Sequence, residues 1–482
     1  MPFNTEIFLF FFLPLCLVLF YLIKGSKYRI EIFVLSFFSL LFYAWDEPKW
    51  LILLIISIVS NYFFGQIIYK ENRRYILTIS IIFNISFIAW FKYRYFIANT
   101  FLGTNLENNF FIPLAISFFT FQQIAFLVDI HDKSIKPLKF LDHLFFVSFF
   151  PQLIAGPIVL AKDIVPQINK MKEKKKINSL ILGIFIFFVG LFKKAFLSDN
   201  LVPYICIGFN NIYNDLTFIE AWATISMYAL RLYFDFSGYS DMAVGLGLLF
   251  GLRLPVNFNL PYKSRSIIDF WKRWHITLTK FFTFYLYSPL SLYMSRVFSN
   301  NLIFLLIIPF LVTFILSGLW HGADWKFVFF GLVNGIGLII NHLWKFYKMP
   351  KLPYIIGWFL TMTTILVSFV FFRANTTEEA IYFLSIMFNP SIFFSPHWLE
   401  QYIDIKFFKS AFTPLFSSGV FTLKYLVVFL FSFTLAIKIP NVTSINFRLK
   451  YNWYYAFLLA IMVLFSIINL NKEDDFFIYF QF

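Results

Sequence analysis

Hydrophobic residues in this chain form long runs separated by short polar loops. Runs of roughly 17–25 apolar residues can cross a bilayer as helices, because every backbone N–H and C=O then finds its partner inside the segment. The pattern predicts membrane-spanning helices over residues 7–23, 31–45, 50–69, 75–97, 111–130, 178–196, 216–234, 301–317, 326–345, 354–372, 379–394, 421–438 and 452–470. We therefore expect an all-α polytopic membrane protein.

The composition supports this class. Of 482 residues, 60% are hydrophobic and 13% are charged, whereas soluble proteins carry about 25% charged residues. The formal net charge is +15, and the basic residues lie in short loops beside the runs, as the positive-inside rule describes. The expected partners of this charge are membrane lipids and not nucleic acid. The lysine run at 170–176 is interpreted in the same way, as a solvated loop near the lipid surface.

The loop charges also predict an orientation. The first run lacks a basic leader and a small-residue cleavage site, so we interpret it as an uncleaved span. Lys24, Lys27 and Arg29 follow it and are expected in the cytoplasm, which places the N-terminus outside. Asp46 and Glu47 then fall in an outside loop.

The stretch 143–160 is apolar but contains Pro151, Gly156 and Pro157, and basic loops flank it on both sides. If both loops are cytoplasmic, the segment enters and leaves on one side as a re-entrant hairpin. Such backbone is tolerated only inside protein or beside a wet cavity. The alternative is an ordinary kinked span with one basic loop outside.

Polar residues crowd into the centre of the chain, between 231 and 290. Asp235 and Asp241 flank a predicted Ser-Gly-Tyr-Ser turn at the end of an apolar helix. Buried acids of this kind are either structural partners of nearby cations or catalytic carboxylates. The other candidate polar residues in or near this stretch are Tyr233, Ser237, Tyr239 and Asn257.

Residues 266–279 predict an amphipathic helix lying at the membrane interface. At 100° per residue its apolar side chains form one face and its charged side chains the other. Trp274 belongs to the apolar face, and His275 sits at its edge. His275 is either a hydrogen-bonded structural histidine or a second histidine of a reaction site.

His321 follows Trp320 at the end of the run 301–317 and precedes the next run. An imidazole between two membrane-length segments is costly unless it has a function. Because its ordinary pKa lies near 6.5, histidine is well suited to act as a general base at neutral pH. No metal site is expected.

Several motifs together resemble the membrane-bound O-acyltransferase (MBOAT) family, in particular its bacterial branch of alginate and peptidoglycan acetylating proteins, which also includes the lipoteichoic-acid D-alanylation protein. The motifs are Leu153-Ile154-Ala155-Gly156-Pro157-Ile158, Tyr233-Phe234-Asp235-Phe236-Ser237-Gly238-Tyr239-Ser240-Asp241-Met242-Ala243, Asn257-Phe258-Asn259-Leu260-Pro261-Tyr262, Phe270-Trp271-Lys272-Arg273-Trp274-His275-Ile276-Thr277-Leu278, Gly318-Leu319-Trp320-His321-Gly322-Ala323 and Phe372-Arg373-Ala374. The chain departs from many members at Thr283-Phe284-Tyr285 and the following Pro289, which leaves the acceptor polymer open.

The resemblance implies about 11–13 transmembrane helices around a central funnel, with re-entrant and interfacial helices. It divides the chain into N-terminal transmembrane helices at 1–110, a catalytic core at 111–380 and C-terminal transmembrane helices at 381–482. His321 would be the catalytic histidine and His275 the second one. Tyr239 is a further candidate for orienting the reactants, and the basic residues expected to hold a donor are Lys263, Arg265, Lys272 and Arg273.

The activity implied is transfer of an acyl group, most simply acetyl from cytoplasmic acetyl-CoA, to hydroxyls of a cell-envelope polysaccharide. No bound cofactor is expected, and acetyl-CoA would be the donor. An extracytoplasmic SGNH-type partner with a Ser-His-Asp site would complete delivery, and the chain would lie in a bacterial cytoplasmic membrane. The alternatives are D-alanyl transfer to a surface polymer, a polytopic transporter or flippase without acyl chemistry, and a non-catalytic scaffold.

Overall fold

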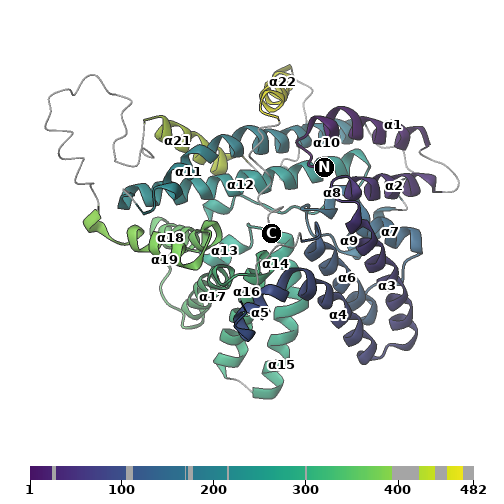
Figure 1. Ribbon diagram of the computed structural model, residues 1–482, viewed down its shortest axis with the longest axis horizontal. Coiled ribbons are helices and arrows are strands. Elements are labelled where there is room, and N and C mark those ends of the chain that lie inside the picture. The colour runs from purple at the N-terminus through teal and green to yellow at the C-terminus, as the bar shows by residue number, and fades with distance from the viewer. Residues whose placement is uncertain are drawn as a thin grey trace.

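The structure is a computed structural model that describes residues 1–23, 29–104, 112–168, 170–171, 177–213, 216–298, 301–392, 423–439 and 453–470. Throughout these ranges the regular structure is helical, as predicted (Figure 1). The helices are η1 Phe8–Phe12, α1 Leu13–Ile23, α2 Ile30–Ala44, α3 Lys49–Glu71, α4 Arg74–Ile88, η2 Ala89–Tyr93, α5 Arg94–Leu102, α6 Ile116–His131, α7 Phe140–Ser148, α8 Phe150–Leu153, α9 Ala161–Ile168, α10 Ile177–Leu191, η3 Phe192–Ser198, η4 Asp199–Leu201, α11 Val202–Asn210, α12 Phe218–Leu249, η5 Pro261–Lys263, α13 Ile267–Trp271, α14 Ile276–Phe282, η6 Thr283–Tyr287, α15 Ser288–Phe298, η7 Ile303–Ile307, α16 Ile308–His321, α17 Trp325–Phe346, α18 Tyr354–Arg373, α19 Thr377–Met387, η8 Pro390–Ile392, α21 Leu423–Lys438 and α22 Trp453–Ile468.

Several of these helices are long and apolar enough to cross a membrane. Within the described ranges there are 6 such helices: Lys49–Glu71, Arg74–Leu102, Ser179–Asn210, Ile303–His321, Trp325–Phe346 and Tyr354–Arg373. Shorter apolar helices lie at Phe8–Ile23, Ile30–Ala44, Ile116–His131 and Ala456–Ile468. The prediction of an all-α polytopic membrane protein is therefore confirmed. The span predicted over 379–394 is wrong, because α19 ends at Met387 after 11 residues.

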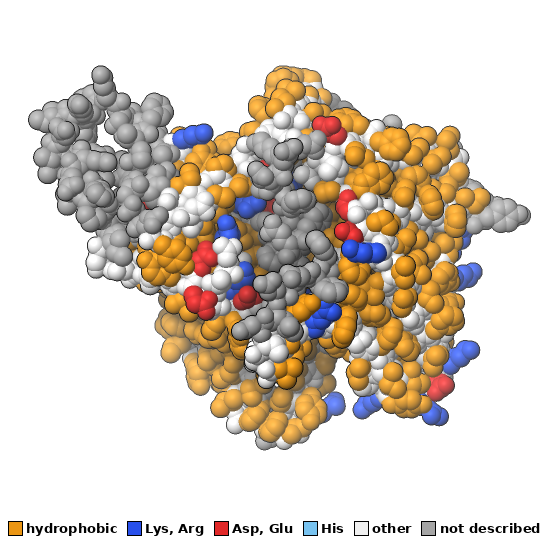
Figure 2. Space-filling model, viewed as in Figure 1, with side chains coloured by type: hydrophobic (Ala, Val, Ile, Leu, Met, Phe, Trp, Pro, Cys, Tyr) orange, Lys and Arg blue, Asp and Glu red, His pale blue; other side chains and the backbone are white. Residues whose placement is uncertain are grey.

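The outer surface suits lipid. Large apolar side chains are widely exposed, including Phe101 at 77%, Leu22 at 75% and Ile355 at 75%. Figure 2 shows apolar side chains covering much of the visible face. In water such a surface would be strongly unfavourable, whereas acyl chains solvate it without cost.

Helices α10 and α12 form a closely packed pair across the upper part of Figure 1. A Cβ on Gly190 would lie 2.5 Å from the backbone oxygen of Gly238, so only glycine permits this approach. Two prediction errors fall here: α12 continues to Leu249 and does not end near residue 234, and the predicted Ser-Gly-Tyr-Ser turn lies inside the helix.

Helix α12 tolerates its two aspartates because lysine side chains neutralise them. Asp241 pairs with Lys193 at 2.6 Å, and Asp235 pairs with Lys194 at 2.8 Å. Lys194 also contacts Asp199 at 2.7 Å. The structure therefore places both aspartates as partners of buried cations, the first of the two interpretations left open by the sequence.

The segment after α6 is broken, as the re-entrant interpretation requires. Helices α7 and α8 are short, and the backbone from 154 to 160 is non-helical yet wholly buried. Helix α9 packs back against α7, so the chain returns towards its point of entry. The stretch is therefore not one continuous helix of the roughly 20 residues that cross a bilayer, and this break is what the re-entrant interpretation requires.

The amphipathic helix predicted over 266–279 is also only partly correct. Its apolar face is buried, with Trp271 6% and Trp274 3% exposed, so these indoles pack inside the protein. The helix is divided into α13 and α14 by His275, whose φ of 42° lies in the left-handed region. That backbone conformation cannot continue a right-handed helix.

Candidate active site

Both candidate histidines lie at the base of one helical hairpin. The outgoing arm runs from α14 through η6 into α15, and the returning arm runs from η7 into α16. His275 immediately precedes the first arm and His321 is the last residue of the second, and they are 1% and 4% exposed. The hairpin thus brings together two residues that are distant in the sequence.

Trp320 connects the two imidazoles. The ring centroid of Trp320 lies 5.8 Å from that of His275 and 4.7 Å from that of His321. His321 also faces the rings of Phe372 at 5.0 Å and Phe330 at 5.5 Å. The histidines therefore share an aromatic enclosure in which water is largely excluded.

Asn257 determines the proton position on His275. Its Oδ1 accepts hydrogen bonds from the backbone N–H of Thr277 (3.2 Å) and from the Thr277 hydroxyl (3.0 Å), and lies 3.1 Å from His275 Nδ1. A backbone N–H can only donate, so this amide atom must be the oxygen. It follows that His275 Nδ1 carries a proton, and in the neutral ring Nε2 holds the lone pair.

The buried non-helical segment 154–160 is tied to the same site. The backbone N–H of Ile158 donates to the Thr277 hydroxyl at 3.0 Å, and the side chain of Gln122 donates to the carbonyl of Val159 at 3.3 Å. The non-helical backbone is thereby satisfied within the protein. Through Thr277 and Asn257, this backbone is linked by hydrogen bonds to His275.

The end of α16 is fixed by close packing against α17. A Cβ on Gly318 would lie 2.1 Å from the carbonyl oxygen of Phe327, so the two backbones touch there. The π-helical turn η2 holds the same end from another side, because Lys92 and Tyr93 donate to carbonyls of Leu319, Trp320 and His321. The sequence pattern did not single out these two residues. A lysine inside the apolar run 75–97 was the available signal.

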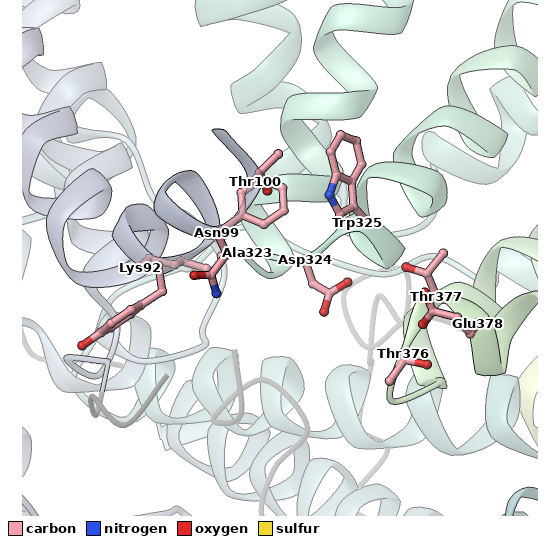
Figure 3. Close-up of a pocket in the computed structure, with 11 residues that line it drawn as sticks. Lys92, Asn99, Thr100, Ala323, Asp324, Trp325, Thr376, Thr377 and Glu378 are labelled. Carbon is pink, nitrogen blue, oxygen red and sulfur yellow. The ribbon is translucent and has the colours of Figure 1, made fainter. Parts of the chain in front are cut away.

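A pocket of about 560 Å³ adjoins this helix end (Figure 3). Its lining residues are Lys92, Tyr95, Phe96, Asn99, Thr100, Ala323, Asp324, Trp325, Thr376, Thr377 and Glu378. Helices α17 and α19 both begin at the pocket, capped by Asp324 and Thr376. Backbone and Thr376 hydrogen bonds lower the pKa of the exposed Glu378 carboxyl. His321 is not a lining residue, so the pocket lies beside the reaction site and does not contain it.

The predicted donor-binding residues lie at the opposite end of α17 and α18. Arg265 stacks over Tyr354, the first residue of α18, at 4.1 Å, and the backbone of Ile267 contacts Asn341 near the end of α17 at 2.8 Å. Since α17 has 22 residues, about 30 Å separate its ends. Lys263 and Lys272 are exposed, while Arg273 pairs with Asp269 at 2.9 Å.

The remaining predicted residues are buried around α12. The ring centroid of Tyr233 lies 6.5 Å from that of Trp274, the residue before His275. Ser237 is buried, with 1% of its surface exposed. The ring of Tyr239 instead stacks on Phe3 at 4.6 Å, in the N-terminal segment. Its predicted role towards the reactants stays a prediction.

Comparison with known proteins identifies the class. Residues 77–371 match the model of the membrane-bound O-acyltransferase family, and the chain belongs to this family. It is therefore an O-acyltransferase.

Three relatives indicate the branch. The chain is 39% identical to the peptidoglycan O-acetyltransferase of Helicobacter pylori over 424 residues, which cover 79% of this chain and 78% of the relative. It is 34% identical to the probable alginate O-acetylase AlgI of Azotobacter vinelandii over 407 residues, covering 81% and 78%. Identity to the teichoic acid D-alanyltransferase of Bacillus subtilis is 30% over 233 residues, covering 46% and 57%.

Proposed function

We propose that this protein transfers acetyl groups from cytoplasmic acetyl-CoA, across a bacterial cytoplasmic membrane, to hydroxyls of a cell-envelope polysaccharide. The observation that carries the proposal is the pair of buried histidines around Trp320, placed between an exposed basic loop and a pocket at opposite ends of α17. A two-sided site of this kind suits a donor and an acceptor that approach from different faces.

In the proposed reaction, neutral His321 accepts the hydroxyl proton as the oxygen attacks the thioester carbonyl. The tetrahedral intermediate collapses, the C–S bond breaks, and CoA thiolate leaves and takes up the proton. The products are the O-acetyl ester and CoA–SH. His275 Nε2, which holds the lone pair in the neutral ring, can only accept a hydrogen bond, so it orients the acceptor substrate through another of its O–H or N–H groups. Base catalysis of this type contributes about 10²–10⁴-fold.

The acceptor hydroxyl belongs to the polysaccharide itself or to the serine of an extracytoplasmic SGNH-type partner that passes the acetyl group on. The relatives that match 79% and 81% of this chain are named for peptidoglycan and alginate acetylation, so these polymers are the first acceptors to test. D-alanyl transfer is the second candidate, because teichoic acid D-alanyltransferases match about half of this chain.

The proposed orientation places the N-terminus outside. The N-terminal amine pairs with Asp46, so the chain start and the α2–α3 loop lie on one side. The last turn of α17 contains Lys345, and the loop after it contains Lys348 and Lys351. These lysines are expected on the cytoplasmic side. The pocket at the other end of α17 then faces outwards. Single cysteines at Thr377 and Lys351 should react with impermeant reagents from the outside and the inside, respectively.

The activity is tested with protein reconstituted in liposomes, radiolabelled acetyl-CoA and short peptidoglycan or alginate fragments, with and without a purified SGNH protein. His321→Ala should lower turnover by at least about 100-fold, whereas the matched control His131→Ala, at the end of α6, should retain it. Normal turnover by a folded His321→Ala protein would contradict the base role. Replacing the donor with a D-alanyl thioester tests the second candidate, and solute movement without thioester cleavage would indicate a flippase.

A further inference from the structure

The end of the histidine helix is held by two adjacent residues from a distant helix. Lys92 Nζ donates to the carbonyl of Trp320 at 2.5 Å and lies 3.4 Å from that of His321. The hydroxyl of Tyr93 donates to the carbonyl of Leu319 at 2.6 Å. Lys92 is 4% exposed. Three successive carbonyls in the last turn of α16 thus receive donors from one short segment.

These carbonyls need partners. The last four C=O groups of an α-helix have none within the helix and carry the negative end of its dipole. The chain after α16 supplies the N–H of Gly322, which donates to Leu319 at 3.1 Å, and then turns directly into α17. The buried ammonium of Lys92 satisfies the carbonyls of Trp320 and His321 and also matches the charge of the helix end, while the Tyr93 phenol is a second donor to the carbonyl of Leu319.

Lys92 and Tyr93 both point to the end of α16 because their own helix contains a π-helical turn. Residues 89–93 form a π-helical turn between α4 and α5. Such turns are rare in proteins overall, and those that occur are often found at functional sites. Here the turn directs two consecutive side chains towards the same helix end. The next turns of the same helix supply Tyr95, Phe96 and Asn99 to the pocket wall.

We propose that Lys92 and Tyr93 are positioning residues that fix the location and rotation of the α16 end, and with it the His321 imidazole, relative to the adjoining pocket. The inference rests on the proposed function, because it assigns the two residues to the reaction of His321. They do not take the transferred proton. Their effect is geometric: two donors on three carbonyls prevent both sliding and rotation of the last turn.

The size of the effect follows from the geometry of catalysis. A misplacement of about 1 Å in a catalytic group can cost about 100-fold in rate. Lys92→Met removes the ammonium while keeping a chain of similar length, and should lower kcat about 10- to 100-fold with an unchanged KM for acetyl-CoA. Lys92→Arg can still donate to two carbonyls, so it should recover a large part of the activity. Tyr93→Phe removes one hydroxyl and should lower kcat several-fold.

The chain offers a matched control. Tyr21 donates to the carbonyl of Leu249, the last residue of α12. Tyr21→Phe therefore removes the same kind of contact as Tyr93→Phe, from a helix end that carries no histidine. It should keep kcat near that of the parent protein.

The experiment measures kcat and KM for acetyl-CoA in liposomes, together with thermal unfolding of each variant. A selective kcat loss in Lys92→Met and Tyr93→Phe, with recovery in Lys92→Arg, is the expected result. If Lys92→Met does not fold, the comparison of Tyr93→Phe with Tyr21→Phe and of Lys92→Arg with the parent decides. If the Lys92 and Tyr93 variants have the same kcat as Tyr21→Phe while His321→Ala is inactive, the positioning role of Lys92 and Tyr93 is overturned. Activity in His321→Ala would instead overturn the proposed function.

Discussion

Asn257 offers the sharpest test of the site. Its amide oxygen receives three hydrogen bonds, from His275 Nδ1, the Thr277 backbone and the Thr277 hydroxyl. Asn257→Ala removes the acceptor from all three donors at once. The substitution should therefore impair both local stability and the tautomer of His275.

The magnitudes can be separated. Leaving a buried donor without a partner costs about 1–3 kcal/mol, so the Thr277 contacts account for most of the expected stability loss. The bond to neutral His275 contributes about 0.5–1.5 kcal/mol, which at the upper end is about tenfold in the population of the reactive tautomer. Loss of ring orientation adds up to about 100-fold. The two factors multiply, so we expect kcat to fall by up to about 1000-fold.

Two variants isolate these contributions. Thr277→Val removes the hydroxyl that bonds Asn257 and Ile158 but leaves the bond to His275, so its stability should fall while its kcat falls less than in Asn257→Ala. Asn259→Ala alters an exposed side chain two residues away and should change neither quantity. Acetyl transfer in liposomes and thermal unfolding in detergent are measured in parallel. If Asn257→Ala and Thr277→Val lose the same activity at the same stability, the tautomer argument is wrong.

Three further predictions concern packing and charge. Lys194→Met leaves two buried carboxylates without their cation and should destabilise the protein by about 3–5 kcal/mol; an unchanged unfolding temperature would show that the pairs are not needed. Gly318→Ala should cost about 1–3 kcal/mol by overpacking, whereas Gly335→Ala should cost less, because its nearest contact is a side chain at 3.3 Å. Replacing Lys263, Arg265 and Lys272 with alanine should raise the KM for acetyl-CoA between about threefold and about a hundredfold, from about 0.2–1 kcal/mol per exposed charge. That increase should shrink at high salt, and a KM independent of these residues would remove them from donor binding.

The sequence predicts well what depends on hydrophobic length. The membrane-length helices, the break near Pro151 and Pro157, and the position of His321 at a helix end all follow from apolar runs and from proline and glycine. These features are local, so a single segment contains the physical reason for them.

What the sequence did not predict depends on partners elsewhere in the chain. Helix α12 continues past Asp235 because Lys193 and Lys194, on another helix, neutralise its acids. The helix predicted around Trp274 breaks because Asn257 and Thr277 hold His275 in a left-handed conformation. Neither partner can be identified from the periodicity of the segment it affects, because periodicity reports only which face is buried.

The contacts of His321 also bear on where the catalytic unit begins. The predicted core starts at residue 111, yet Lys92 and Tyr93 bind the carbonyls of the histidine helix from outside that boundary. Residues 77–371 match the family model, a range that includes both of them. The three supports of the site come from distant parts of the chain: the π-helical turn, the non-helical segment at Ile158, and the non-helical segment at Asn257. Removing the helices before residue 111 would therefore take away the Lys92 and Tyr93 contacts and leave the end of α16 held by its packing against α17, even if the remaining helices still packed.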